Sequence, residues 1–494
     1  MARSPLPPVP SSLIEVEVGD SLRRREPLAV VLTSGFDSAP DASPYADQAT
    51  GARATGKTGE VQSGQDGAGP RWFVGAGEGT ERDYRAAGAA FVRAANGVAE
   101  AEAANGGRPP KTVQVLLPGR AGAAAFAAFA TGALLGGYRF VVSNEEPKRT
   151  VKTLRLLTEG ERDAGTSDAV ARARELAAAS ALARDLANTP SNVKTPAWLA
   201  GVAERLAGDV PGLNATIRDE QWLAAQNFGG VLAVGGGSAR PPRLIELTYR
   251  PRGASKHLLL VGKGITFDTG GISIKPAAGM HLMRTDMAGG GAVIAAARAI
   301  ASLKLGIRLT AIVPAAENHV SGSSYRPGDI VRHYGGRTAE VANTDAEGRM
   351  VLADALAYGV RRYSPDAVVD VATLTGAMKV ALGLRTGGLF ATDDELAERV
   401  SAAGERAGEQ WWRMPLLDDL ADEVRSDIAD VRQAPPGPGG ITAALFLREF
   451  NGGLPWAHLD IAGPARSEKN YDDVVPGGTG FAARTLVELA ASYD

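Results

Sequence analysis

Four apolar runs in the C-terminal two thirds of this chain, separated by amphipathic segments, constrain its fold most. The runs are HLLLVG at 257–262, RLTAIVP at 308–314, AVVDVATLTG at 367–376 and WAHLDIAG at 456–463, and helical patterns lie at about 287–303, 350–362, 393–408 and 441–450. Strands that are apolar throughout are buried on both faces, and strands separated by helices usually pair in parallel. We therefore predict an α/β fold with a central, mostly parallel sheet covered by helices. Functional residues are expected at the carboxyl ends of its strands.

The N-terminal third shows the same alternation on a smaller scale. Apolar runs occur at 27–33, 72–74, 113–118 and 138–143, with helical patterns at about 81–99 and 119–136. An Ala-rich segment at about 168–188 ends at Thr189-Pro190 and is interpreted as a connecting helix. We predict a smaller N-terminal α/β domain over 1–166, a connecting helix over 167–190 and a larger C-terminal α/β domain over 191–494. Residues 34–70, rich in Gly, Ser, Ala, Asp and Thr, are predicted to be a flexible insertion of the first domain.

Composition excludes several classes of function. The 494 residues include 53 Lys and Arg against 56 Asp and Glu, so the net charge of −3 does not indicate a nucleic-acid partner, although it leaves room for a local basic patch. The absence of Cys excludes disulfides, thiolate nucleophiles and Cys zinc sites. The N-terminus lacks the apolar run of a signal peptide, and the Ala- and Gly-rich stretch 121–142 is interpreted as a buried helix and strand. A cytoplasmic protein without a membrane partner is expected.

Some familiar motifs are interpreted as coincidental or absent. GARATGKT at 51–58 satisfies the phosphate-loop pattern, but neither a buried strand nor a helix is predicted around it. No G-x-S-x-G elbow of a serine hydrolase occurs. The histidines include no i, i+4 pair for a helical zinc site, so each is interpreted as structural: His257, His281, His319, His333 and His458.

Two loops concentrate ionisable side chains. One follows the apolar run 257–262, and the other, Asn343-Thr-Asp-Ala-Glu-Gly-Arg349, precedes an apolar helical pattern. If the two loops meet, basic groups converge with four carboxylates: Lys263, Lys275 and Arg349 with Asp268, Asp286, Asp345 and Glu347. Crowded carboxylates repel strongly, so cations must lie among them. Two divalent metal ions, Zn, Mn, Mg or Co, meet this need, and an ion-pair network with the basic residues is the alternative.

Two such metals would support hydrolysis, because they lower the pKa of a bridging water and polarise the bond it attacks. Lys275 could stabilise a developing oxyanion. Arg349, at the amino end of a predicted helix, could hold a small anion. The residues alone do not separate a peptidase from a phosphatase or from another two-metal hydrolase of esters or amides. They also leave open a binding protein with structural charges, for example one that contacts DNA.

These motifs resemble those of the leucine aminopeptidase (cytosol aminopeptidase) family of two-metal exopeptidases. The resemblance rests on NTDAEGR at 343–349 and VGKGITFDTGGISIKP at 261–276, with further similarity at 183–196, 317–329, 371–377, 441–450 and 456–463. It covers about residue 183 to the C-terminus. It implies a metal-dependent aminopeptidase that releases N-terminal residues, preferably leucine or other large apolar ones, from peptides through a hydroxide bridging two metals. It also implies that 191–494 form the metallopeptidase domain and that the chain assembles as a homohexamer.

The resemblance also implies roles for individual residues. One metal would be held by Lys263, Asp268, Asp286 and Glu347, and the other by Asp268, Asp345 and Glu347, with the Asp345 carbonyl oxygen. A lysine that binds metal is neutral, so the pKa of Lys263 should be lowered beside a dication. Lys275 would be the electrophilic catalyst, and Arg349 would hold bicarbonate as general base.

The free amino group of the substrate would bind a metal, which implies that a blocked N-terminus prevents cleavage. The resemblance also implies a first side-chain pocket near Met283, Thr373, Leu374, Gly376 and Ala462, with a largely apolar wall suited to leucine or methionine.

Overall fold

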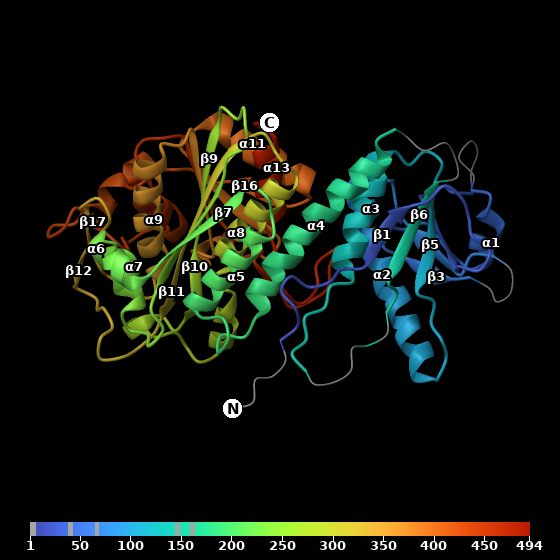
Figure 1. Cartoon of the computed structure of the whole chain (residues 1–494), viewed down its shortest axis with the longest axis horizontal. Helices are drawn as coiled ribbons and strands as arrows, with labels where there is room; N and C mark the ends of the chain where they lie inside the picture. The colour runs from blue at the N-terminus through green and yellow to red at the C-terminus, as the bar shows by residue number, and fades with distance from the viewer. Residues whose placement is uncertain (1–5, 38–42, 65–68, 144–147, 149, 159–163) are drawn as a thin grey trace. The chain divides into compact units, whose positions relative to one another are not determined.

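The computed structural model divides the chain into two compact units, each with its own sheet (Figure 1). The structure describes residues 6–37, 43–64, 69–143, 148, 150–158 and 164–494. The first unit comprises Met1–Ala181 and Glu468–Pro476, and the second comprises Leu182–Ser467 and Gly477–Asp494. Both units combine strands and helices, which confirms the predicted α/β class.

The N-terminal unit contains a six-stranded sheet in the order β1-β6-β5-β2-β4-β3. Its strands are β1 (Glu15–Val18), β2 (Leu28–Leu32), β3 (Val61–Ser63), β4 (Trp72–Gly75), β5 (Thr112–Leu117) and β6 (Thr153–Thr158). All pairs are parallel except β3 with β4. Helices α2 (Glu81–Ala104) and α3 (Ala123–Gly136) share a core with the sheet that includes Phe91 and Phe129, and α1 (Ala46–Gly51) belongs to a second core around Phe36 and Phe73.

One predicted strand of this unit is wrong. Residues 138–143 form no strand. The strand that pairs with β5 is β6, for which the sequence pattern predicted no strand. Tyr138 is buried and Phe140 packs against the same core, so this run buries its aromatic side chains without joining a sheet. Apolar content alone therefore did not distinguish a packed loop from a strand.

The segment 34–70 contains α1 and β3 within the described residues, whereas 38–42 and 65–68 lie outside them. Its flexibility stays a prediction. The phosphate-loop match at 51–58 begins at the last residue of α1 and is followed by β3, so it lacks the strand-to-helix setting that phosphate binding needs. Helix α4 (Thr166–Asn188) includes Ala181, the residue at which the two units divide.

The C-terminal unit is built on a nine-stranded sheet in which eight strands follow the order β16-β15-β18-β14-β9-β11-β8-β7, and β10 pairs with β11. The strands are β7 (Leu213–Arg218), β8 (Arg243–Tyr249), β9 (His257–Gly262), β10 (Gly264–Asp268), β11 (Arg308–Asn318), β14 (Ala367–Ala372), β15 (Thr386–Ala391), β16 (Gln410–Arg413) and β18 (Trp456–Asp460). The five strands β9, β10, β11, β14 and β18 run parallel to one another. The predicted central sheet is thus confirmed, and antiparallel pairings occur toward its edges, between β11 and β8, β8 and β7, and β18 and β15.

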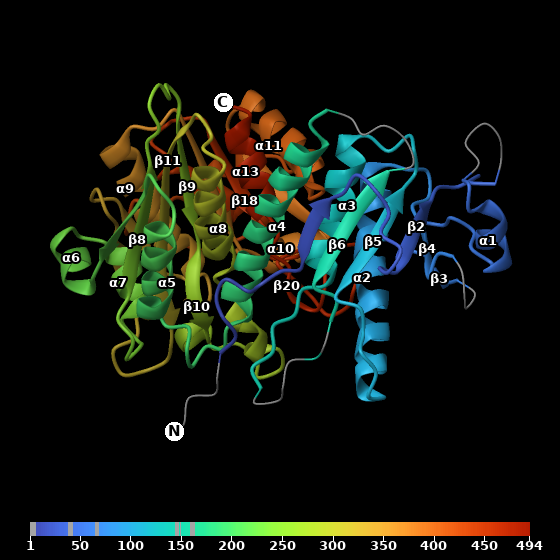
Figure 2. The ribbon, with the colours of Figure 1, turned by 45° about the vertical axis from the view of Figure 1, so that its right-hand side comes forward.

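Helices cover both faces of this sheet (Figures 1 and 2). On one face lie α7 (Gly229–Gly235), α9 (Glu347–Tyr363) and α12 (Gly439–Arg448), whose side chains share a core with Leu259, Ile312 and Val368 of the sheet. Against the other face pack α5 (Pro196–Gly208), α8 (Ala288–Ser302), α11 (Asp394–Ala407) and α13 (Ala483–Ala491). This double covering explains why β9, β14 and β18 are buried along their whole length.

Shorter elements connect this frame. They are α6 (Glu220–Ala225), α10 (Gly376–Leu382), the 3-10 helices η1 (Gly271–Ser273), η2 (Met280–Thr285) and η3 (Asp418–Val424), and the strands β12 (Ile330–Arg332), β13 (Thr338–Glu340), β17 (Val431–Arg432), β19 (Arg466–Ser467) and β20 (Gly477–Gly478).

Close packing of α8 against the sheet requires glycine at its amino end. A Cβ atom on Gly289 would lie 2.1 Å from the carbonyl oxygen of Val371. This oxygen belongs to the backbone of a buried strand, so the clash could be relieved only by moving the strand or the helix. We expect Gly289→Ala to lower the free energy of unfolding by about 1–3 kcal/mol, because the added methyl group overpacks the interface. Gly201→Ala in α5 is the matched control: nothing lies near its Cβ position, so it should raise the free energy of unfolding by about 0.4–1 kcal/mol. Chemical denaturation of both variants measures the contrast, and an unchanged midpoint for Gly289→Ala would contradict the packing argument.

Candidate metal centre

The carboxyl ends of the five parallel strands carry the polar residues of the site. Lys263 directly follows β9, Asp268 ends β10, Asn318 ends β11, Thr373 follows β14 and Asp460 ends β18. Because parallel strands end at one edge of a sheet, these residues are brought together although they lie far apart in the sequence.

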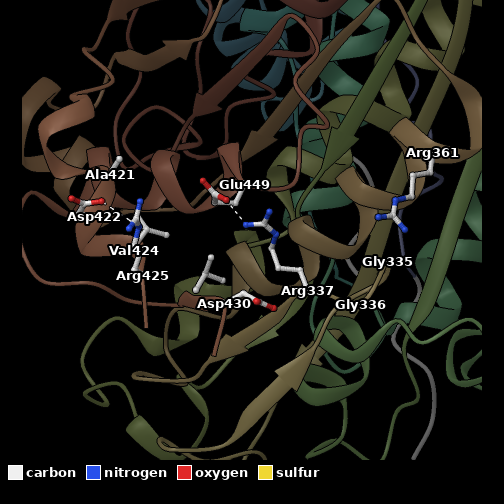
Figure 3. Close-up of a pocket in the computed structure, with 11 residues that line it drawn as sticks. Gly335, Gly336, Arg337, Arg361, Ala421, Asp422, Val424, Arg425, Asp430 and Glu449 are labelled. Atoms are coloured by element: carbon white, nitrogen blue, oxygen red, sulfur yellow. Dashed lines mark hydrogen bonds and ion pairs between the residues drawn. The ribbon is translucent and has the colours of Figure 1, made fainter. Parts of the chain in front are cut away.

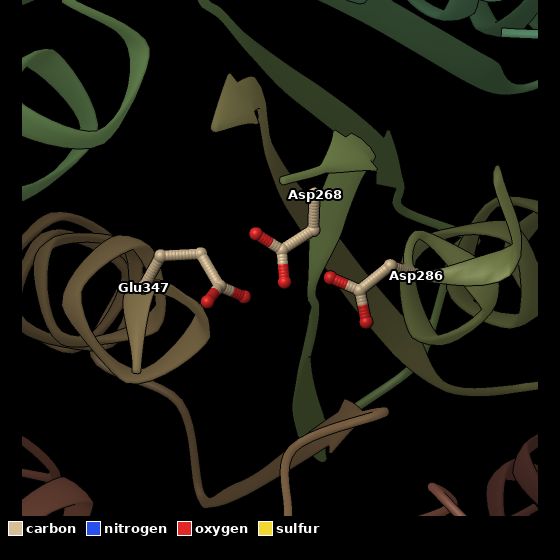
Figure 4. A group of neighbouring side chains, drawn as sticks. All are labelled: Asp268, Asp286 and Glu347. Carbon is tan, nitrogen blue, oxygen red and sulfur yellow. The ribbon is translucent and has the colours of Figure 1, made fainter. Parts of the chain in front are cut away.

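Three carboxylates converge at this edge. Asp268, Asp286 and Glu347 each present a carboxylate oxygen within 4.8 Å of the others, and their side chains point toward one another (Figure 4). Asp286 stands between η2 and α8, and Glu347 is the first residue of α9. All three residues are buried, with relative exposures of 1%, 7% and 1%. The two acidic loops of the sequence therefore do meet.

Local hydrogen bonds hold the two loops together. The buried Thr344 donates from Oγ1 to the carbonyl oxygen of Gly270 (2.8 Å) and accepts at Oγ1 from the backbone N–H of Ser273 (2.9 Å). Asn318 donates from Nδ2 both to Asp268 Oδ1 (2.8 Å) and to the carbonyl oxygen of Thr344 (3.0 Å). Gly270 has φ +85°, a left-handed conformation that lets the chain turn directly after Asp268.

Each lysine of the site pairs with two carboxylates. Lys263 Nζ lies 2.9 Å from Asp286 Oδ2 and 2.7 Å from Glu347 Oε1. Lys275 Nζ lies 2.8 Å from Asp268 Oδ2 and also forms an ion pair with Asp345. Asp345, the fourth predicted carboxylate, thus joins the cluster through Lys275.

The electrostatics leave room for further positive charge. When all four are ionised, the carboxylates carry two more charges than the two ammonium groups neutralise. Burial raises the pKa of Asp268, Asp286 and Asp345 and so opposes this ionised state unless a further cation is bound. Burial opposes the charge of Lys263, but Asp286 and Glu347 raise its pKa. The lowered pKa expected for a metal-bound lysine would therefore have to come from the metal.

The donor set fits divalent metal ions. Glu347 Oε2 is buried and accepts no hydrogen bond from any described residue, so this carboxylate has an oxygen to spare for a ligand. Carboxylate oxygens are donors suited to Zn, Mn, Mg and Co. A purely internal ion-pair network would leave that oxygen and the excess negative charge uncompensated.

Arg349 lies in the first turn of α9, as predicted, and is buried. Its Nη1 donates to the carbonyl oxygen of Gln433 (2.8 Å), while its Nε has no acceptor in the described part of the chain. Burial lowers the pKa of Arg349 to about 10, which still leaves the guanidinium charged at neutral pH. A charged, buried group with an unused donor suits a small anion.

Three of the residues predicted to line the substrate pocket form hydrogen bonds at the same edge of the sheet. Thr373 Oγ1 donates a hydrogen bond to the carboxylate of Asp286. The backbone N–H groups of Leu374 and Ala462 both donate to the carboxylate of Asp460. Met283 lies on η2 and Gly376 begins α10.

Sequence reasoning missed Asn318, Thr344 and Asp460 as parts of this site. Asn318 and Asp460 are completely buried polar residues at the ends of apolar strands. A polar residue that ends an apolar strand at the functional edge is the signal that could have identified them.

A separate pocket of about 610 Å³ shares no lining residue with this centre (Figure 3). Its arginines are largely compensated: Arg337 pairs with Glu449, and Arg425 lies 3.2 Å from Asp422. Basic and acidic side chains are equally numerous in its lining, so the pocket favours neither charge of ligand.

A parallel-sheet edge that carries buried carboxylates and lysines defines a candidate divalent-metal enzyme. The chain belongs to the cytosol aminopeptidase family, because the catalytic-domain model of that family matches residues 181–487. The site residues Lys263 to Arg349 lie inside the matched range.

Curated relatives and solved structures agree. A probable cytosol aminopeptidase of Syntrophotalea carbinolica is 48% identical over 365 residues, covering 72% of this chain and 73% of that protein. Another from Leifsonia xyli is 48% identical over 379 residues, covering 74% and 75%. The bottromycin maturation enzyme BotP in complex with Mn superposes with a TM-score of 0.83 at 38% identity, covering 94% of this chain and 99% of that one. A mutant of tomato leucine aminopeptidase gives a TM-score of 0.84 at 31% identity, covering 97% and 96%.

The chain is accordingly a metal-dependent aminopeptidase, and the predicted family is confirmed. Within the described residues, no helix is both long and apolar enough to cross a membrane.

Proposed function

We propose that the chain is a two-metal aminopeptidase that releases N-terminal residues, preferably leucine or other large apolar ones, from peptides. The observation that carries this proposal is the convergence of Asp268, Asp286 and Glu347 in a buried cluster with excess negative charge. Membership of the cytosol aminopeptidase family supports peptides as substrates.

The proposed ligands follow the contacts of the cluster. Lys263, Asp268, Asp286 and Glu347 would hold one metal, and Asp268, Asp345 and Glu347 the other. When bound, two divalent ions supply a bridging water of lowered pKa and polarise the scissile carbonyl group. Mn²⁺ is the first ion to test, because the similar BotP structure is in complex with Mn, and Zn²⁺ is the second.

The chain's own side chains would manage the developing charges. The ammonium group of Lys275 pairs with Asp268. It would donate a hydrogen bond to the carbonyl oxygen of the scissile peptide bond as negative charge develops on that oxygen. Arg349 would hold bicarbonate through its unused Nε donor, and that anion would accept the proton of the attacking water.

Substrate selection would follow from the same edge. A free amino group is needed at the metal centre, so a blocked N-terminus should prevent cleavage. Met283, Thr373, Leu374, Gly376 and Ala462 would form the pocket for the first side chain. A homohexamer in the cytoplasm is part of the proposal by resemblance to the family.

We expect the metal-free protein to take up about two Mn²⁺ ions per chain and to become more thermostable as it does so. Ligand at 100 times its dissociation constant stabilises the folded state by about 2.7 kcal/mol per site. Elemental analysis after dialysis gives the stoichiometry, and differential scanning calorimetry with and without chelator gives the shift in Tm. Hydrolysis of leucine anilide against a phosphoester then identifies the reaction. No bound metal after reconstitution, or a preference for the phosphoester, would refute the proposal.

A further inference from the structure

Asp460 is a buried carboxylate that belongs neither to the proposed metal ligands nor to the proposed substrate pocket. It is the last residue of β18, pairs in register with Ala372 at the end of β14 and has no exposed surface. Burying a carboxylate is costly unless hydrogen bonds satisfy it, so its partners indicate what it stabilises.

Both of its oxygens accept hydrogen bonds from the loops that follow β14 and β18. Oδ1 accepts from the backbone N–H groups of Leu374 (3.2 Å) and Ala462 (3.1 Å). Oδ2 accepts from the backbone N–H of Thr375 (3.0 Å) and from its Oγ1 (2.6 Å). Burial raises the pKa of Asp460, whereas His458 and these hydrogen bonds oppose the rise. Asp460 therefore ties together two loops that the sheet alone leaves separate.

The first of these loops contacts two proposed ligands of one metal. The carbonyl oxygen of Thr373 accepts a hydrogen bond from Lys263 Nζ (2.9 Å). Its Oγ1 donates to Asp286 Oδ1 (2.8 Å) and is 3.0 Å from the carbonyl oxygen of Asp286. Thr373 directly precedes Leu374 and Thr375, so a displacement of those residues would move Thr373 and with it both ligand contacts.

We propose that Asp460 is a positioning residue that sets the geometry of one metal through Thr373 and fixes the Leu374 and Ala462 walls of the first side-chain pocket. The inference rests on the proposed two-metal function. Partners of this kind, which orient ligands without touching the ion, commonly affect metal affinity by 10–100-fold.

Asp460→Asn tests this assignment with little change in volume. In either orientation, the amide places its NH₂ group against at least one backbone N–H that donates to the carboxylate, so at least one of the four hydrogen bonds is lost. We expect Mn²⁺ titrated calorimetrically into the metal-free variant to bind one of two sites about 10–100-fold more weakly. At saturating Mn²⁺, discrimination between leucine and alanine anilides should also fall, through KM more than through kcat.

Asp354→Asn is the matched control. Asp354 is equally buried and accepts hydrogen bonds from the backbone N–H groups of Val231 and Tyr334 and from His333 Nδ1, but from none of the site residues. It should destabilise the fold while leaving both Mn²⁺ affinities at wild-type values. Equal losses of affinity in the two variants would show a merely structural role and overturn the proposal.

Thr375→Val covers the case in which Asp460→Asn does not fold. It removes the Oγ1 donor of Asp460 and also the N-cap hydrogen bond that this oxygen accepts from the backbone N–H of Met378, and Thr375→Ser should restore both. We expect a loss of Mn²⁺ affinity in Thr375→Val and recovery in Thr375→Ser. Wild-type Mn²⁺ affinity and anilide selectivity in Thr375→Val or in folded Asp460→Asn would overturn the positioning role. Failure of the wild-type chain to bind Mn²⁺ would instead refute the proposed function itself.

Discussion

Glu347→Gln is expected to lose both metal binding and peptide hydrolysis. Glu347 is buried, pairs with Lys263 and has a second carboxylate oxygen without a partner among the described residues, which is the arrangement expected of a ligand shared by two ions. The amide removes the negative charge that opposes repulsion between dications. The loss of kcat/KM should exceed the roughly 10–100-fold that follows loss of a residue outside the ligand set.

Metal analysis and peptide hydrolysis, measured on one preparation, check this expectation. Asp427→Asn provides the control, since Asp427 is an exposed carboxylate and should be replaceable without effect. If Glu347→Gln kept two ions per chain and wild-type turnover, Glu347 would not be the ligand that the two ions share.

Lys275→Ala is expected to keep its metals yet lose turnover. Lys275 contacts Asp268 and Asp345 through its ammonium group but is not one of the proposed ligands. Its removal makes the cluster more negative, which favours cations, while the donor for the developing oxyanion disappears. Loss of one such donor costs about 10²–10³ in kcat.

Steady-state kinetics at saturating Mn²⁺ separates these effects, because kcat should fall far more than KM changes. Lys256→Ala is the matched control. This lysine is exposed and its ion pair with Asp366 is long, at 3.9 Å, so its loss should leave kcat and KM unchanged. Wild-type kcat in Lys275→Ala would exclude Lys275 as the electrophilic catalyst, and loss of bound metal would show that it supports the ions instead.

The sequence contained enough information for the central sheet and for the carboxylate cluster. The runs at 257–262 and 456–460 are predominantly apolar, which favours burial on both faces, and every residue of β9 and β18 is buried in the structure. The acidic residues follow or precede such elements directly. Strand ends in a parallel sheet leave few places for Asp268 and Glu347 other than one common edge.

Partners distant in sequence were not predictable in the same way. Asn318 reaches Asp268 and Asp460 reaches Thr375 only because β11 and β18 take particular positions in the strand order. That order arises from tertiary packing, which no local pattern encodes. The strand predicted at 138–143 was wrong for a related reason, because its aromatic residues pack into a core from a loop.

The position of β18 in the sheet has a consequence for how activity arises during synthesis. This strand comes late in the chain but lies between β14 and β15, which are made earlier. To pair with these two strands, β18 must form contacts between residues far apart in the sequence, and such contacts form slowly. A growing polypeptide thus lacks Asp460, and with it the complete edge, until nearly all of the chain has been made. Peptide hydrolysis at this edge is therefore expected only once synthesis of the chain is almost finished.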